Sequence, residues 1–441
     1  MNKSNNAEII LRSAQKAMDL GDYDVAIENF SELININKSD VDAYYNRGSC
    51  KFQKEDYKNA IDDYSKVIEI EPDDGFPFYE IGCCYLNLEN YKSAISFYSK
   101  ALDLLGGYSD AYYCRGICNF YLDNFQSAID DYSKAIDLKP EDSENFQRRA
   151  DCKFQLGDNK GAIDDYSKAI DLNSKDDYSL LQRGISKFLI GGQYIFDAFD
   201  DFSKAITLNP QCKLSFYYRG RCNRKDSNDS IQWAIDDFSK AIKIDEYFSS
   251  AYLSRGYCKT IQGEYKNAIE DFTKVVEIDP TNSHAFHNLG ICMTRDNEYK
   301  NSLNELGLLV VQIDSNPRII SNIKFVESLE SIGSPKIKIN NTKSLSAIQN
   351  FSSAIDLNPR FADSFFWRGF HMFILGNYQE AIKDFSSAID LNPNHDEAYR
   401  NRGLIKMYLL AYRDAESDLS KALEINPNSL CSNSIKICKD K

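Results

Sequence analysis

The sequence has no long apolar run and no excess of positive charge. Nowhere in the 441 residues do about 18 apolar residues follow one another, so no membrane-spanning helix is expected. The 52 Lys and Arg against 66 Asp and Glu give a formal net charge of -14. This charge argues against nucleic acid as the main ligand, because phosphate binding needs a basic face.

Motifs of catalysis and cofactor binding are also missing. The chain has 4 histidines and no HExxH pair, and it contains neither a GxxxxGK[ST] loop nor a GxSxG turn. We therefore predict a non-enzymatic protein with no cofactor, no metal site and no catalytic residues. The first residues, MNKSNNAEII, have neither the apolar core of a signal peptide nor an Arg-rich transit pattern, so we expect a cytoplasmic protein.

The 12 cysteines do not have the spacing of a disulfide framework or a zinc site. Most of them share one position, two residues after a small residue in the repeat described below: Cys50, Cys84, Cys118, Cys152, Cys222, Cys258 and Cys292. Equivalent positions in neighbouring repeats lie beyond the ~7 Å Cα separation that a disulfide allows. We expect buried structural thiols, as suits a reducing compartment.

One segment of the sequence recurs along the chain. AYYNRGSCKFQKEDYKNAIDDYSKVIEIEP, from Ala43, returns from Ala111 as AYYCRGICNFYLDNFQSAIDDYSKAIDLKP, two periods of 34 residues later. A small residue marks the middle of each first helix, and a second small residue follows twelve positions later, as in Gly48 and Ala60. Apolar residues then follow at helical spacing, so each repeat is predicted to be two amphipathic helices.

This pattern resembles the tetratricopeptide repeat (TPR) family over about residues 7–429. The resemblance implies an all-α fold, a right-handed α-solenoid superhelix of about twelve helix-turn-helix units. It also implies a concave groove, lined by the first helices, that holds a peptide or helix of another protein.

The regularity of the pattern changes along the chain. We predict an N-terminal arm of about nine repeats over 1–316, a degenerate repeat split by a loop over 317–346, a C-terminal arm over 347–429, and a short tail over 430–441. The tail is too short and polar to predict a capping helix. Two extra residues between Gly184 and Ala198, and again between Gly220 and Ala234, predict longer turns there.

An arginine precedes the central small residue in most repeats, and an aspartate follows in the second helix. The pairs are Arg47–Asp63, Arg115–Asp131, Arg149–Asp165, Arg183–Asp201, Arg219–Asp237, Arg255–Asp271, Arg368–Asp384 and Arg402–Asp418. Where the arginine is absent the aspartate is absent too: one repeat has Ile81 with Phe97, and the first has Ser13 with Asn29. This coupling predicts a contact between the two helices of each pair, with a structural role.

Aromatic and basic residues at positions expected to face the groove are the candidates for partner binding. They are Tyr45, Tyr79, Tyr113, Tyr217, Arg221 and Arg224. The tyrosines have two interpretations, as interface anchors or as packing between adjacent repeats. The two arginines lie in a locally basic repeat and suit an acidic peptide or a phosphate group.

The leading functional hypothesis is therefore an adaptor that binds another protein in its groove. The alternative is a structural subunit of a large assembly, such as an axonemal, ciliary or organellar complex. Some members of the family clamp the C-terminal carboxylate of chaperones with lysines and asparagines. Asn46, Asn288 and Asn401 occupy one clamp position, but their neighbours do not match, so this co-chaperone function is less expected.

Overall fold

The structure, a computed structural model, describes residues 3–223, 228–295, 341–429 and 431–440, and every regular element in these ranges is an α-helix. The all-α prediction is confirmed. In chain order the helices are α1 (Lys3–Asp19), α2 (Tyr23–Ile36), α3 (Val41–Gln53), α4 (Tyr57–Ile70), α5 (Gly75–Asn87), α6 (Tyr91–Leu105), α7 (Ser109–Tyr121), α8 (Phe125–Leu138), α9 (Ser143–Gln155), α10 (Asn159–Leu172), α11 (Asp177–Ile190), α12 (Tyr194–Leu208), α13 (Lys213–Cys222), α14 (Asn228–Ile244), α15 (Ser249–Ile261), α16 (Tyr265–Ile278), α17 (Ser283–Arg295), α20 (Asn341–Leu357), α21 (Ala362–Ile374), α22 (Tyr378–Leu391), α23 (Asp396–Tyr408), α24 (Tyr412–Ile425) and α25 (Ser432–Asp440).

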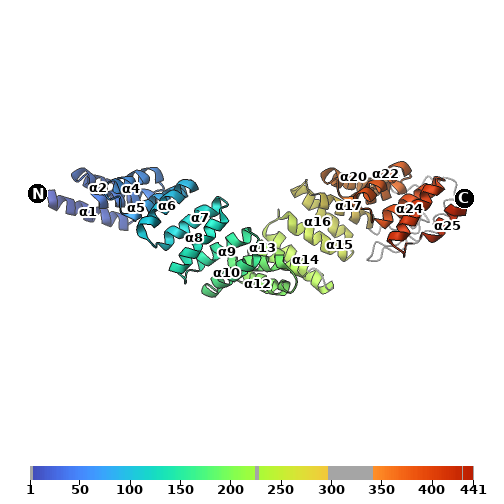
Figure 1. The fold of residues 1–441 in the computed structure, drawn as a ribbon, viewed down its shortest axis with the longest axis horizontal. Coiled ribbons are helices and arrows are strands. Elements are labelled where there is room, and N and C mark those ends of the chain that lie inside the picture. The colour runs from blue at the N-terminus through green and yellow to red at the C-terminus, as the bar shows by residue number, and fades with distance from the viewer. Residues whose placement is uncertain (1–2, 224–227, 296–340, 430, 441) are drawn as a thin grey trace. The chain divides into compact units, whose positions relative to one another are not determined.

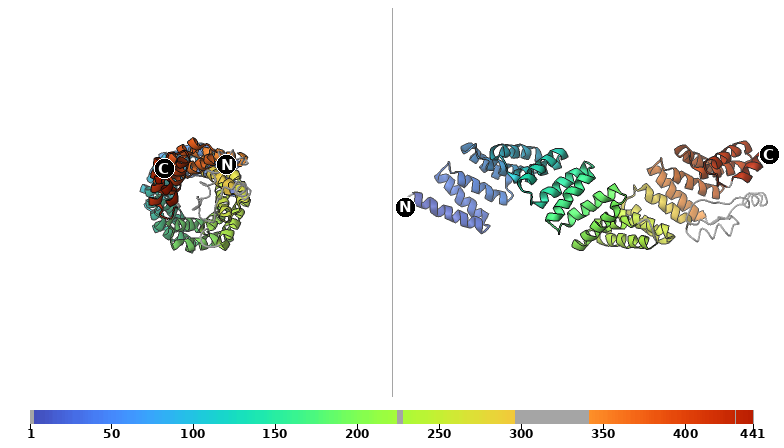
Figure 2. Two further views of the ribbon diagram at one scale, coloured as in Figure 1. Left: turned by 90° about the vertical axis from the view of Figure 1, so that its right-hand side faces the viewer. Right: turned by 60° about the horizontal axis from the view of Figure 1, so that its bottom comes forward.

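The helices form two compact bodies, Met1–Pro210 and Gln211–Lys441. In the N-terminal body α1 to α12 form consecutive antiparallel pairs, and the second helix of each pair packs on the first helix of the next (Figure 1). The C-terminal body follows the same rule from α13 to α24 and adds α25 at its end. Within each body the pairs succeed one another in chain order, as the second view of Figure 2 also shows.

Most helix pairs are closed by an aromatic ring packed on a small residue, and in the last pair, α23 with α24, Leu419 packs on Gly403 instead. A Cβ atom added to Gly256 would lie 2.8 Å from the ring of Phe272, and one added to Gly116 would lie 2.8 Å from the ring of Tyr132. Both rings are fully or almost fully buried. The absent side chain therefore lets the two helices approach, and the aromatic ring of the second helix fills the space between them.

The longer turn predicted after Gly184 is absent: the turn over 191–193 has three residues, as in the regular pairs, and the two extra residues lengthen α11 and α12 to 14 and 15 residues. Helix α11 ends at Ile190, and Gly191 and Gly192 both adopt positive φ angles, 77° and 59°, before α12 begins at Tyr194. Two successive residues with positive φ reverse the chain there, and glycine adopts this conformation without a Cβ clash.

The interruption of the repeat pattern lies inside a helix pair. Helix α17 packs against α20, and the ring of Phe351 on α20 covers Gly290 on α17 as the ring of Phe272 covers Gly256. Ala347, with which the predicted C-terminal arm begins, lies in α20 and so belongs to the helix that pairs with α17, while the arm boundaries themselves stay a prediction. The described helices thus form eleven pairs and one final helix. Most of the predicted split repeat, 317–346, lies outside the described residues.

The end of the chain also differs from the expectation of a polar tail. Helix α25 packs on α24, and Cys431 and Cys438 are buried in one cluster with Leu404 and Leu419. A last pair leaves an apolar face without a neighbour, and a short helix is enough to cover it.

Replacing Phe351 by Ala tests the pairing of α17 with α20. We expect Phe351→Ala to lower the free energy of unfolding by about 3–4 kcal/mol, as for other buried aromatic rings. Phe385→Ala is the matched control, because this equally buried ring has the same role on α22. Guanidinium denaturation followed by circular dichroism measures both. A much smaller loss for Phe351→Ala than for Phe385→Ala would contradict the pairing.

The predicted arginine–aspartate contacts are confirmed in all eight pairs. In each, the guanidinium donates from Nε and Nη2 to the two carboxylate oxygens, with Nη2 to oxygen distances of 2.6–2.8 Å. The repeat without the arginine packs Phe97 beside Ile81, and the first repeat has a hydrogen bond of 3.2 Å from Asn29 to Ser13. The two positions therefore change together because the side chains touch.

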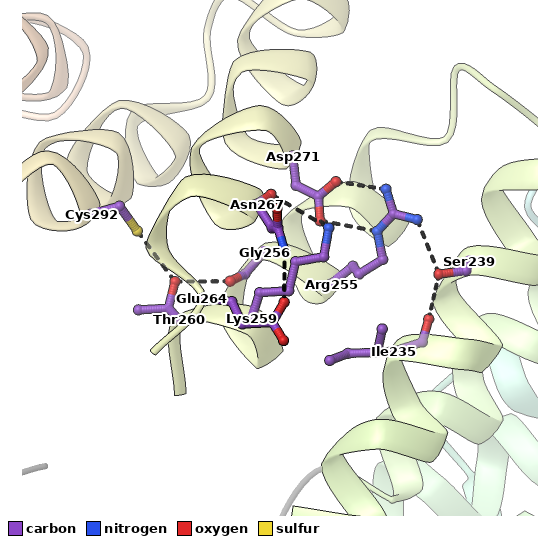
Figure 3. A network of polar contacts seen from close by, with 10 residues as sticks. All are labelled: Ile235, Ser239, Arg255, Gly256, Lys259, Thr260, Glu264, Asn267, Asp271 and Cys292. Atoms are coloured by element: carbon purple, nitrogen blue, oxygen red, sulfur yellow. Dashed lines mark hydrogen bonds and ion pairs between the residues drawn. The ribbon is translucent and has the colours of Figure 1, made fainter. Parts of the chain in front are cut away.

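The same arginines also join consecutive pairs. Figure 3 shows Arg255 on α15, which binds Asp271 on α16 and donates from Nη1 to Ser239 on α14 over 3.0 Å. Arg47, Arg115, Arg149, Arg183, Arg368 and Arg402 each donate in the same way to a serine of the preceding second helix. One side chain thus fixes three helices.

Lysine adds a second cation to most of these carboxylates. Lys259 lies 2.9 Å from Asp271, and Lys153 lies 2.7 Å from Asp165. In the fourth pair Asn119 takes the place of this lysine and donates to Asp131 over 2.9 Å. Burial raises the pKa of Asp131, opposed by Arg115 and then by Asn119. Asp131 therefore relies on one cation.

This difference predicts that two equivalent substitutions lower the free energy of unfolding by unequal amounts. Arg115→Met leaves Asp131 buried without a cation and should lower the free energy of unfolding by about 3 kcal/mol. Arg149→Met leaves Asp165 its lysine, so its cost should be about half as large. Denaturation midpoints at neutral pH measure both variants. Equal losses would show that the lysine contributes nothing to the network.

Candidate functional site

The sequence-predicted site residues lie in both bodies. Tyr45, Tyr79 and Tyr113 are on the successive first helices α3, α5 and α7 of the N-terminal body, and Tyr217 and Arg221 are on α13 of the C-terminal body. Arg224 lies outside the described residues. The structure therefore brings together the three N-terminal tyrosines as a series along neighbouring pairs.

These three tyrosines are half-buried between neighbouring helices. Their rings pack on the buried tyrosine of the second helix of their own pair, with centroid distances of 5.5, 5.7 and 6.0 Å. The hydroxyl of Tyr45 donates to Glu80 on α5 over 3.0 Å, and the hydroxyl of Tyr113 donates to Glu144 on α9. Burial, followed by the neighbouring glutamate, raises the pKa of both phenols. These contacts give the tyrosines a part in joining repeats, and their role in partner binding stays a prediction.

Tyr217 and Arg221 form an aromatic and basic cluster on α13. The guanidinium of Arg221 lies over the rings of Tyr217 and Tyr218, 5.6 and 5.8 Å from their centroids. The ring of Tyr217 also packs on Phe248, 5.1 Å away between centroids. Cation–π contact holds the arginine against its own helix.

A small surface pocket lies between the first helices α7 and α9. Its volume is about 120 Å³, and it is lined by Ile117, Phe120 and Tyr121 of α7, by Tyr132 of α8, and by Arg148 and Asp151 of α9. Small-molecule sites are usually larger, roughly 300–1,000 Å³. The pocket suits a single side chain better than a cofactor.

The pocket combines apolar walls with a carboxylate that is buried at some energetic cost. Asp151 is 8 % exposed and accepts hydrogen bonds from the hydroxyls of Tyr166 (2.7 Å) and Tyr178 (3.1 Å). Burial raises the pKa of Asp151, although both hydroxyls and Arg148 oppose the effect. At the rim Arg148 pairs with Glu144 over 3.3 Å.

The sequence analysis did not single out Arg148 and Asp151. Both follow the 34-residue period: Arg148 stands where α7 has Cys114, and Asp151 stands where α7 has Ile117. A charged residue at a position that is neutral in the preceding repeat was the available signal. The repeat pattern does not indicate such a residue, because the pattern is defined by the positions that recur.

Metal binding finds no support in the described ranges, which contain no group of three His, Cys, Asp or Glu side chains able to hold an ion. The cysteines at the shared position are buried as predicted, except that Cys222 is half-buried, and none of these seven forms a disulfide. In the same ranges no helix is both long and apolar enough to cross a membrane.

The stacked helix pairs define a helical-repeat protein, a solenoid. Models of the tetratricopeptide repeat match residues 41–74, 78–104, 109–142, 143–176 and 249–282, and a TPR repeat model matches residues 15–50 and 371–407. Together these matches span about half of the sequence. The chain belongs to the tetratricopeptide repeat family, whose members generally serve as protein-interaction scaffolds without catalysis.

Solved structures of the same kind resemble parts of the chain. MamA from Desulfovibrio magneticus RS-1 is 22% identical, with 40% of this chain and 98% of that chain covered and a TM-score of 0.38. YrrB, described as a TPR protein with an unusual peptide-binding site, is 20% identical, with 53% and 97% covered and a TM-score of 0.38. The C-terminal part of a TPR repeat-containing protein from Cytophaga hutchinsonii is 19% identical, with 56% and 99% covered and a TM-score of 0.48. No curated protein matches the chain.

Replacing Asp151 by Asn tests whether the pocket holds an ionised group at the expense of stability. The pKa of Asp151 is raised in the folded state, so binding of the proton stabilises the fold. This contribution to the free energy of unfolding is fully present at acid pH and is lost as the pH rises through the raised pKa. Asn keeps an acceptor for the two tyrosines and does not ionise. We therefore expect Asp151→Asn to be more stable than the wild type at neutral pH, by about 1 kcal/mol.

The pH dependence separates this cause from a simple change in packing. The advantage of Asp151→Asn over the wild type should shrink as the pH falls from 7 towards 4, because the wild-type carboxyl then becomes neutral. Denaturation midpoints across this range measure it. An advantage that stays constant with pH would contradict the assignment.

Proposed function

We propose that this chain is a non-enzymatic, cytoplasmic adaptor that binds an extended segment of another protein along the first helices of its N-terminal body. The pocket between α7 and α9 is the observation that carries the proposal. A pocket walled by Phe120, Tyr121 and Tyr132 can receive one apolar side chain and exclude water from it, as interface anchors require. The free thiols are consistent with a reducing compartment.

The charges beside the pocket indicate a basic partner segment. Glu144 and Asp151 flank the single cation Arg148, and the whole chain carries a formal net charge of -14. An acidic surface attracts basic segments over long range and raises their rate of association. We propose a segment that inserts an apolar side chain and places a lysine or arginine near the two carboxylates.

The sequence-predicted residues extend this proposal. Tyr45, Tyr79 and Tyr113 flank the path of the segment along α3, α5 and α7. Tyr217 and Arg221 belong to a second, basic surface on α13, which suits an acidic segment. Arg224 lies outside the described residues, and its part in binding stays a prediction.

A structural subunit of a large assembly is the second candidate function. It is favoured by aromatic side chains exposed on second helices, of which Phe196 on α12 is 77% exposed and Trp233 on α14 is 60% exposed. Exposed rings of this size often mark contacts with other proteins.

Filling the pocket tests the adaptor function. Peptides selected on the intact protein from a random display library should contain an apolar residue next to basic residues. Ile117→Arg should weaken their binding, measured by titration calorimetry, by about tenfold or more, as expected for the loss of an anchor. The fold tolerates arginine at this position, because Arg221 occupies the equivalent position of α13.

Phe196→Ala is the matched control, since it removes an exposed ring from a second helix and leaves the pocket intact. Peptide binding that is unchanged in Ile117→Arg would refute binding at the pocket. Binding lost in Phe196→Ala and kept in Ile117→Arg would favour the structural subunit instead.

A further inference from the structure

Two cysteines outside the shared buried position lie together between consecutive first helices. Cys83 is on α5 and Cys114 is on α7, and these helices have Cα atoms within 8 Å of each other. Both side chains are half-buried against the same core cluster of the third and fourth pairs, and the interaction between the two thiols raises the pKa of Cys83 and lowers that of Cys114. A disulfide needs Cα atoms within about 7 Å of each other, and the close approach of α5 and α7 makes such a link between these helices feasible.

Two tyrosines complete the cluster around the sulfurs. The hydroxyl of Tyr98 on α6 donates to the sulfur of Cys83 over 3.4 Å. The ring of Tyr79, on α5, belongs to the same cluster and packs on that of Tyr98 with the centroids 5.7 Å apart. Two phenol groups therefore lie beside the pair of thiols.

This arrangement favours the thiolate of Cys114. Hydrogen bonds from Cys83, and then from Tyr98 and Tyr79, lower the pKa of Cys114 against the effect of burial. Cys118, one turn further along α7, has no such donors, and burial raises its pKa to about 12. Thiolate character decides which cysteine reacts with an oxidant.

We propose that Cys83 and Cys114 form a peroxide-sensitive dithiol site that closes to a disulfide between α5 and α7. The thiolate of Cys114 attacks one oxygen of hydrogen peroxide, the O–O bond breaks, and hydroxide leaves to give a sulfenic acid. The sulfur of Cys83 then attacks the sulfenic sulfur, the S–O bond breaks, and water leaves. Overall, two thiols and one peroxide give one disulfide and two waters. A cellular thiol reductant reverses the reaction by exchange.

Peptide mapping of the intact protein tests the site directly. The reduced chain is exposed to hydrogen peroxide, its remaining thiols are alkylated, and the protein is digested with trypsin. Cleavage after Lys66, Lys92, Lys100 and Arg115 places Cys83 in peptide 67–92 and Cys114 in peptide 101–115, apart from Cys118. The expected product is these two peptides joined by a disulfide within one chain.

Single substitutions identify which cysteines form the disulfide. Peptide 67–92 also contains Cys84, so Cys84→Ser should still form the link, whereas Cys83→Ser should not. Cys83→Ser should instead accumulate a sulfenic acid at Cys114, which is trapped by dimedone. Circular dichroism of each variant establishes that the helices are retained.

Three results would overturn the proposal. They are a link that survives in Cys83→Ser, oxidation of Cys118 in preference to Cys114, and a wild-type protein whose two thiols stay reduced under peroxide. The site does not depend on the proposed binding function, since the mapping needs no partner.

Discussion

The guanidinium group that bridges three helices is the interaction on which the stack depends. Each such arginine neutralises an aspartate that is almost fully buried, so removing it would leave a charge inside the protein. It also reaches a serine of the preceding pair, and its planar fork permits both contacts in only one orientation. The flat face of Arg255 lies over Tyr252, three residues earlier, which further restricts that orientation. The angle within a pair and the packing between pairs are therefore set by one side chain.

Much of this scaffold could be predicted from the sequence, because comparing the repeats within one chain shows which positions stay the same and which change together. The joint change of Ile81 with Phe97 was enough to predict a contact that the structure confirms. The serine that completes the network is equally periodic, but Ser65 is kept where Ile81 replaces the arginine and Thr273 keeps a hydroxyl where Leu289 replaces it, so this position did not indicate a contact. The pairing of α17 with α20 could not be predicted from the 34-residue period, because the contact between these helices depends on packing and not on a fixed spacing in the sequence. Helix α25 was missed for a related reason: its burial depends on the exposed face of α24 and not on its own composition.

The candidate site was less predictable than the fold. Tyr45 and Tyr113 were chosen by their position in the repeat, and the structure shows that their hydroxyls are already engaged by glutamates of the next pair. Of the residues that shape the pocket, Asp151 has no counterpart at its position in the other repeats, and Arg148 has one only in Arg12 of the first repeat. In a repeat protein the recurring side chains build the scaffold, so a binding surface has to be sought where one repeat differs from its neighbours. The cluster of Cys83 and Cys114 is a second example of such a local difference.

The pairing of α17 with α20 has a consequence for the evolution of the chain. Residues 296–340 lie in the sequence between the two helices of one pair, and these helices are held together by the packing of Phe351 on Gly290. The entropy of closing a loop grows only slowly with its length, and here the closing contact belongs to the scaffold itself. Sequence can therefore be lengthened, shortened or exchanged between these two helices while the order of the pairs in space stays the same. The ninth pair is a place where this solenoid can acquire new sequence without acquiring a new repeat.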